Sequence, residues 1–99
     1  MARELRFDWE PAKASLNVRR HGVTFSEAAS VFLDEHAILI DDPDHSASED
    51  RFVLLGLGSS LRLLLVCHCY RTEDAVIRII SARKADRREH RAYFGRFHS

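Results

Sequence analysis

The hydrophobic positions of this 99-residue chain follow a helical period in its first third. The period is clearest at four positions spaced three or four residues apart: Phe25, Ala28, Ala29 and Phe32. This spacing places apolar side chains on one face of a helix, and Thr24 with Glu27 forms a capping box at its start. An earlier helix is predicted over residues 11–21, because Pro11 suits a first helical turn and Gly22 a helix end.

Short apolar runs typical of strands follow the second predicted helix. Strands are predicted at residues 37–40, 51–57, 61–70 and 76–82. Loops or tight turns separate them at residues 41–46, Gly58-Ser59-Ser60 and Thr72-Glu73-Asp74. A short strand at residues 5–7 precedes the first helix, and a last helix is predicted from about Lys84 to about Gly95. Because hairpin-length connections favour antiparallel pairing, the predicted fold class is α+β. We expect one domain over residues 1–99, an antiparallel sheet with two N-terminal helices packed on it and a C-terminal helix.

The composition, 45% hydrophobic and 30% charged, is typical of a soluble globular domain. No apolar run has the length of a membrane span and no secretory signal is recognisable, so the expected compartment is the cytoplasm. The net charge of zero hides an uneven distribution. Residues 24–50 hold eight acids and no Lys or Arg, whereas residues 78–98 hold seven Lys or Arg and two acids. This polarity suggests an anion-binding surface and a separate acidic surface for a basic partner, although solvated loops and an ordinary helix face would give the same pattern.

Basic side chains also occur within the predicted strands. The strand set comprises Arg51, Arg62, His68 and Arg78. Each could simply face water, and without the strand register the sequence does not show whether they share one face. A second set, at helical spacing in the last predicted helix, comprises Lys84, Arg87, Arg88 and Arg91. Such a basic stripe suits a phosphate backbone, but it could equally be a solvated helix face.

The first predicted helix carries a polar row of its own, with Lys13, Asn17 and His21 spaced four residues apart. Cys67 and Cys69 are expected to be free thiols, because their positions in one strand do not suit a disulfide. The six histidines are scattered without the spacing of metal ligands, and no phosphate-binding glycine loop or nucleophile elbow is recognisable. We therefore expect neither a metal site nor a cofactor.

Three segments resemble the BrnT toxins: FDWEPAKASLNVRRHGVTFSEAASVF, DPDHSASEDR and IRIISARKADRREHRAY. The resemblance covers about residues 7–93. Its most specific parts are the K-x-x-x-N-x-x-x-H-G-V spacing of residues 13–23 and the R-I-I-S-A-R run of residues 78–83. Two positions depart from the family pattern, Glu10, where aspartate is common, and Arg20, where lysine is usual.

The resemblance implies a RelE-like ribonuclease toxin of a type II toxin–antitoxin pair, which cuts RNA without a metal ion and halts translation. It also implies a BrnA-type antitoxin with a ribbon-helix-helix domain. The complex would repress its own operon and contact operator DNA through the antitoxin.

Metal-free RNA cleavage needs a base, an acid and cations that stabilise a pentavalent phosphate. We expect His68 to be the acid or base, and Arg51, Arg78 and Arg83 to be phosphate clamps, with Lys13 adding a contact. In a regular strand Arg78 and Arg83 would face opposite sides, which would leave one of them a structural role. Two other functions fit the sequence less well: a non-catalytic module that binds nucleic acid or a partner on the same basic surface, and a small metal-dependent hydrolase.

Overall fold

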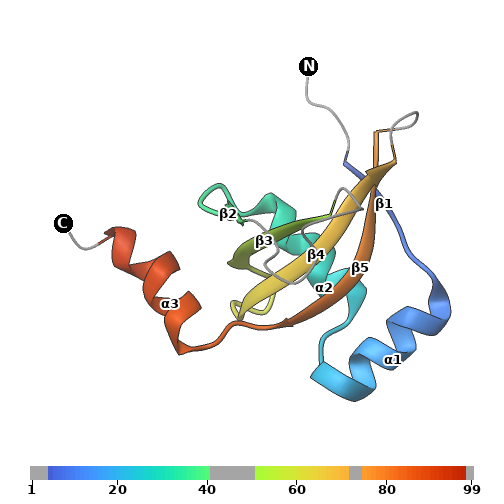
Figure 1. Cartoon of the computed structure of the whole chain (residues 1–99), viewed down its shortest axis with the longest axis horizontal. Coiled ribbons are helices and arrows are strands. Elements are labelled where there is room, and N and C mark those ends of the chain that lie inside the picture. Colours follow the sequence, from blue (N-terminus) through green and yellow to red (C-terminus); the bar gives the residue numbers. More distant parts are fainter. Residues whose placement is uncertain (1–4, 41–50, 72–74, 98–99) are drawn as a thin grey trace.

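A five-stranded sheet forms the centre of the computed structural model, which describes residues 5–40, 51–71 and 75–97 (Figure 1). The strands are β1 (Arg6–Asp8), β2 (Ile38–Ile40), β3 (Phe52–Leu57), β4 (Leu63–Arg71) and β5 (Val76–Lys84). The helices are α1 (Pro11–His21), α2 (Phe25–Ser30) and α3 (Arg87–Phe94), with short 3-10 turns η1 (Val31–Leu33) and η2 (Gly95–Phe97). The loop predicted at residues 41–46 and the turn predicted at residues 72–74 lie outside the described residues.

The strand order in the sheet is β1-β5-β4-β3-β2. Strands β2 to β5 pair antiparallel, as predicted from their short connections. Strand β1, however, pairs parallel with β5, so the sheet is mixed and the prediction of a purely antiparallel sheet is wrong. The reason is that β1 and β5 are separated by most of the chain, so no tight turn imposes their relative direction. The parallel register places Asp8 opposite Arg78.

The helix ends follow the local signals in the sequence. Helix α1 begins at Pro11 and ends at His21, and the next residue, Gly22, has a φ of 67°, the left-handed conformation that glycine adopts without strain. At the start of α2 the Thr24 side chain accepts a hydrogen bond from the backbone N–H of Glu27. The Glu27 side chain bonds instead to Arg62, so only half of the predicted capping box forms. None of the described helices is both long and apolar enough to cross a membrane.

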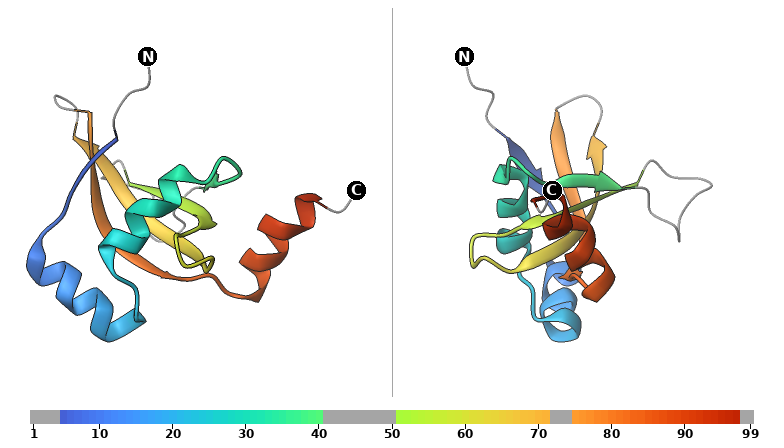
Figure 2. Two further views of the ribbon diagram at one scale, coloured as in Figure 1. Left: turned by 180° about the vertical axis from the view of Figure 1, so that it is seen from behind. Right: turned by 90° about the vertical axis from the view of Figure 1, so that its left-hand side faces the viewer.

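Both faces of the sheet carry apolar residues. One cluster packs α2, η1 and the loop before α2 against β4 and β5, and comprises Val23, Phe25, Ala28, Val31, Leu64, Val66, Ile79 and Ala82. The second lies on the opposite face, where α3 packs, and comprises Val53, Leu55, Leu63, Leu65 and Tyr93. Figure 2 shows α2 lying across the sheet, with α1 and α3 at opposite ends of the molecule.

Helix α3 starts later than predicted, because Lys84 is the last residue of β5 and pairs with Leu64. The backbone N–H of Ala85 also donates a hydrogen bond to the sheet, to the carbonyl of Leu63 in β4. Asp86 then begins the helix in a capping box with Glu89. The four-residue basic stripe predicted on one helix is therefore wrong in one member, since Lys84 lies on a strand.

Candidate functional site

A β-bulge in β5 determines which strand arginines share a face. Cys67 lies opposite Ser81 and His68 lies opposite Ile79, so one extra residue of β5 stands between the two pairs. The extra residue reverses the alternation, and Arg78 and Arg83 therefore project from the same side of the sheet. Their expected separation assumed a regular strand and is wrong. We call this side the arginine face; it carries Arg71, Arg78 and Arg83.

Arg78 is held by a carboxylate from the neighbouring strand. Its Nε donates to Oδ1 of Asp8 at 3.1 Å, while Nη1 of Arg71 donates to Oδ2 of the same carboxylate at 2.7 Å. The hydrogen bond from Arg71 is the main cause of a lowered Asp8 pKa; burial opposes it and the hydrogen bond from Arg78 reinforces it. Asp8 is therefore an anion at neutral pH. Glu10 approaches Nη1 of Arg78 at 3.7 Å, an ion pair but too long for a hydrogen bond.

Arg83 is bound quite differently. Its Nη1 and Nη2 donate to the two carboxylate oxygens of Glu89, both at 3.0 Å. Glu89 also accepts the backbone N–H of Asp86 at 2.7 Å, which completes the capping box of α3. The guanidinium fork that could grip a phosphate is thus occupied, and Arg83 joins the end of β5 to the first turn of α3.

Arg62 and Arg51, both predicted within strands, each lie directly before one, Arg62 before β4 and Arg51 before β3. Arg62 donates from Nε to Glu27 at 3.1 Å and from Nη2 to the carbonyl of Gly22 at 3.1 Å, so it ties the start of β4 to the loop before α2. Its hydrogen bond is the main cause that lowers the pKa of Glu27. Arg51 directly precedes β3 and is half-buried. Because Phe52 packs with His68 and Tyr70 on the other face, alternation places Arg51 on the arginine face.

His68 is fully buried on the face opposite Arg78. Its Nδ1 lies 3.1 Å from the carbonyl of Val66 and its Nε2 lies 3.3 Å from the hydroxyl of Tyr70. The ring of Phe32 packs edge-on against it at 4.8 Å between centroids. Burial lowers the pKa of His68, and the hydrogen bond to Val66 opposes this shift, so the ring is neutral at pH 7. The structure does not bring His68 together with the arginines.

The polar row of α1 divides into one buried and two exposed residues. Asn17 is buried, and its amide donates to the carbonyls of Val23 and Ala82, both at 2.9 Å. Its oxygen accepts a hydrogen bond from the backbone N–H of Ala82 at 3.1 Å. One side chain thus bonds both backbone polar groups of Ala82, at a point of β5 that lies beyond its pairing with β1. Lys13 and His21 are exposed one turn on either side of Asn17, along the same side of the helix.

The arginines of α3 are exposed and make no ion pair with the described residues; they are Arg87, Arg88 and Arg91. Tyr93, on the buried side of this helix, donates to Oδ2 of Asp34 at 2.5 Å. Burial and this carboxylate raise the pKa of Tyr93 to about 12. Tyr93 therefore serves packing, while the arginines face solvent.

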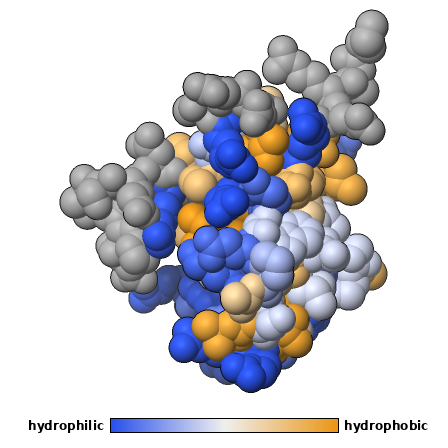
Figure 3. Space-filling model, turned by 90° about the vertical axis from the view of Figure 1, so that its right-hand side faces the viewer, coloured by the Kyte–Doolittle hydropathy of each residue, from blue (hydrophilic) through white to orange (hydrophobic). Residues whose placement is uncertain are grey.

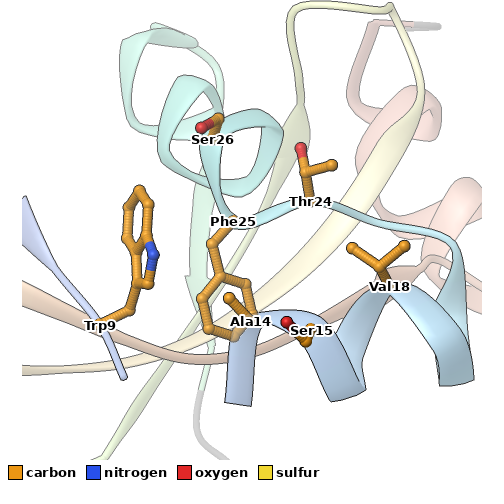
Figure 4. Close-up of a pocket in the computed structure, with 7 residues that line it drawn as sticks. All are labelled: Trp9, Ala14, Ser15, Val18, Thr24, Phe25 and Ser26. Carbon is orange, nitrogen blue, oxygen red and sulfur yellow. The ribbon is translucent and has the colours of Figure 1, made fainter. Parts of the chain in front are cut away.

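A shallow groove of about 270 Å³ lies between α1 and α2 (Figure 4). Its lining comprises Trp9, Ala14, Ser15, Val18, Thr24, Phe25 and Ser26. The rings of Trp9 and Phe25 meet edge to face at 5.8 Å. None of the lining residues is charged, so the groove does not suit a phosphate. Figure 3 shows the side of the molecule that carries β1 and α1, where hydrophilic surface lies between apolar patches.

The sequence did not indicate that Asp8 and Glu10 are neighbours of the arginines. The missing information was the parallel pairing of β1 with β5, which no local pattern reports. Among the residues that the structure describes, no group of three His, Cys, Asp or Glu side chains is arranged to hold a metal ion.

Residues 9–89 match the sequence model of a family described as "Ribonuclease toxin, BrnT, of type II toxin-antitoxin system". The fold is similar to the 1.1 Å crystal structure of the Brucella abortus ribonuclease toxin BrnT, with a TM-score of 0.64 and 19% sequence identity. This similarity covers 85% of the present chain and 100% of the Brucella chain. No curated protein matches the sequence significantly. Because the family match spans most of its length, the chain belongs to the BrnT family of type II toxin–antitoxin ribonuclease toxins.

Proposed function

We propose that the protein is a metal-independent endoribonuclease that cleaves RNA on its arginine face and thereby inhibits translation. The observation that carries the proposal is the state of Arg78. Its Nε is bound to Asp8, and no described residue hydrogen-bonds to its two Nη groups. A guanidinium with this edge available can donate two parallel hydrogen bonds to a phosphate.

The proposed reaction uses the RNA's own 2′-hydroxyl as nucleophile. Its oxygen attacks the adjacent phosphorus and the bond to the 5′-oxygen breaks, so the 2′-proton must leave and the 5′-oxygen must gain a proton. Arg78 would stabilise the extra negative charge on the pentavalent phosphate. Arg51 is proposed as a further phosphate clamp, whereas Arg83, whose Nη groups are both bound to Glu89, is proposed to have a structural role.

Basic residues at the two ends of the molecule would hold the RNA backbone. Lys13 would contact it from α1. The residues proposed at the other end are Lys84, Arg87, Arg88 and Arg91. All of these side chains are exposed, which suits electrostatic contact with phosphates.

The acid or base role of His68 remains a prediction. Its contacts with Phe32 and Tyr70 would have to open before the ring could reach a substrate. This burial favours the second candidate function, an RNA-binding module without catalysis, because it leaves the arginine face without the acid or base expected there.

We further propose that a BrnA-type antitoxin with a ribbon-helix-helix domain neutralises the toxin in the cytoplasm. The acid-rich stretch 24–50 would bind a basic segment of that antitoxin. The complex would bind operator DNA through the antitoxin and repress its own operon. A RelE-like arrangement of the sheet and helices is part of the same proposal.

The test is cleavage of a labelled RNA by the purified protein, with a chelator present. Arg78→Ala should slow cleavage about 100-fold or more, whereas Arg19→Ala removes an exposed arginine of α1 outside the proposed site and should have little effect. His68→Gln tests the histidine, with thermal unfolding measured beside it because the residue is buried. RNA binding without cleavage would support the binding module, and cleavage abolished by the chelator would support a metal-dependent hydrolase.

A further inference from the structure

Asp8 is the one described carboxylate that hydrogen-bonds to two arginines of the arginine face. The parallel pairing of β1 with β5 places it beside Arg78, and the antiparallel pairing of β4 with β5 brings Arg71 to its other side. Three strands thus meet at this carboxylate. Its two oxygens accept from different arginines, at 3.1 Å from Arg78 and 2.7 Å from Arg71.

This arrangement has a specific consequence for Arg78. A free arginine side chain rotates about several bonds, so its guanidinium points in many directions. The hydrogen bond from Nε to Asp8 holds one edge of the guanidinium, and no described residue accepts a hydrogen bond from Nη1 or Nη2. The side chain as a whole is still 36% exposed, which leaves room for a ligand to approach it.

The same carboxylate also offsets the repulsion between two neighbouring cations. Without it, Arg71 and Arg78 would favour conformations that separate their charges. The hydrogen bond from Arg71, reinforced by the one from Arg78, lowers the pKa of Asp8, so Asp8 is a poor acceptor for a proton from a substrate. Its influence on the reaction must pass through the arginines.

We infer that Asp8 is a positioning residue, which orients the guanidinium of Arg78 so that its Nη edge can bind the phosphate being cleaved. The inference rests on the proposed ribonuclease function and adds a residue to its machinery. Glu10, the other acid near Arg78, makes no hydrogen bond to it and does not share this role.

The experiment compares Asp8→Asn with Glu10→Gln, two substitutions that each remove one negative charge near Arg78. Binding is measured with RNA methylated at its 2′-oxygens, which lacks the nucleophile and is not cut. Cleavage is measured on unmodified RNA at saturating protein. Both variants should bind RNA at least as tightly as the unsubstituted protein, because the surface becomes more positive.

The two variants should differ in the rate of cleavage. Asp8→Asn should cleave bound RNA about 10- to 100-fold more slowly, because Arg78 loses its orientation. Glu10→Gln should cleave no more slowly than the unsubstituted protein, and Asp8→Glu, which keeps the charge, should recover part of the rate. Equal cleavage rates for Asp8→Asn and Glu10→Gln would overturn the inference. A loss that merely follows the fraction of unfolded protein in thermal denaturation would overturn it as well.

A second measurement does not depend on cleavage. The Nε–Hε group of Arg78 can be followed by nitrogen-15 NMR and identified by its loss in Arg78→Lys. In the unsubstituted protein this signal should be resolved and should shift when inorganic phosphate is added; in Asp8→Asn it should broaden into the signals of mobile arginines. If the protein shows this behaviour but cuts no RNA, the ribonuclease proposal fails while the positioning of Arg78 stands. An unchanged signal in Asp8→Asn would refute the positioning role whatever the cleavage result.

Discussion

The two ends of β5 each carry an arginine on the same face of the sheet, but the two side chains are bound in different ways. At one end Asp8 accepts a hydrogen bond from Nε of Arg78, and no described residue hydrogen-bonds to its Nη groups. At the other end Glu89 takes both Nη groups of Arg83 and joins the strand to α3. The same residue type on one strand is therefore prepared for a ligand at one end and used for structure at the other. The edge of the guanidinium that meets the carboxylate decides between the two roles.

The largest expected effect is on the rate of RNA cleavage, which substitution of the two arginines should change to different extents. Arg78→Lys keeps the charge but loses the planar pair of donors, and it should slow RNA cleavage about 10- to 100-fold. Arg83→Lys should slow it less than about threefold once unfolded protein is corrected for, since the fork of Arg83 is already occupied. Single-turnover cleavage of a labelled RNA measures both. Equal losses would mean that Arg83 leaves Glu89 and binds the substrate as well.

The next prediction concerns stability at the α3 end. Glu89→Ala removes both the partner of Arg83 and one half of the capping box, and it should lower the free energy of unfolding by about 1–2 kcal/mol. Glu10→Ala, which removes an acid near Arg78 that caps nothing, should cost less than about 0.5 kcal/mol. Denaturant titrations of both variants would show the difference. A fully stable Glu89→Ala protein would contradict the structural role of this end.

A smaller effect is expected from the hydrogen bond between Tyr93 of α3 and Asp34. Tyr93→Phe removes the hydroxyl that donates to Asp34, which keeps its hydrogen bonds from the backbone N–H groups of His36 and Leu57. The expected loss is about 1 kcal/mol in the free energy of unfolding, with RNA cleavage by the folded protein unchanged. A clear fall in cleavage at full stability would show that α3 must be held in place for RNA to be cut.

The smallest effect is a dependence of stability on pH that comes from His68, which is buried on the face opposite the arginines. The pKa of His68 is lowered in the folded protein, so the unfolded chain binds a proton more readily. The stability that comes from the neutral ring is present above the unfolded value of 6.5 and is lost as the pH falls below it towards the lowered folded pKa. Unfolding curves at pH 7 and pH 6 should therefore differ more for the unsubstituted protein than for His68→Gln. Identical pH dependence would mean that His68 is not buried as a neutral ring in solution.

The sequence by itself determined those features that depend on near neighbours. The left-handed end of α1 at Gly22, the Thr24 cap and the Gly58 turn were all predictable, because each relies on contacts within a few residues. The antiparallel pairing of β3 with β4 and of β4 with β5 follows from their short connections in the same way. The sequence also indicated that the C-terminal part would be the basic part of the surface.

The tertiary structure alone decided which of these charges can act together. The bulge brought Arg78 and Arg83 to one face, and the parallel strand β1 carried Asp8 across 70 residues of sequence to meet Arg78. The register of β4 put His68 beneath Phe32 instead of beside the arginines. Strand register and strand direction depend on packing between distant segments, whereas sequence patterns report only the periodicity within one segment. For that reason the sequence could nominate Arg78, but the structure was needed to find the carboxylate that orients it.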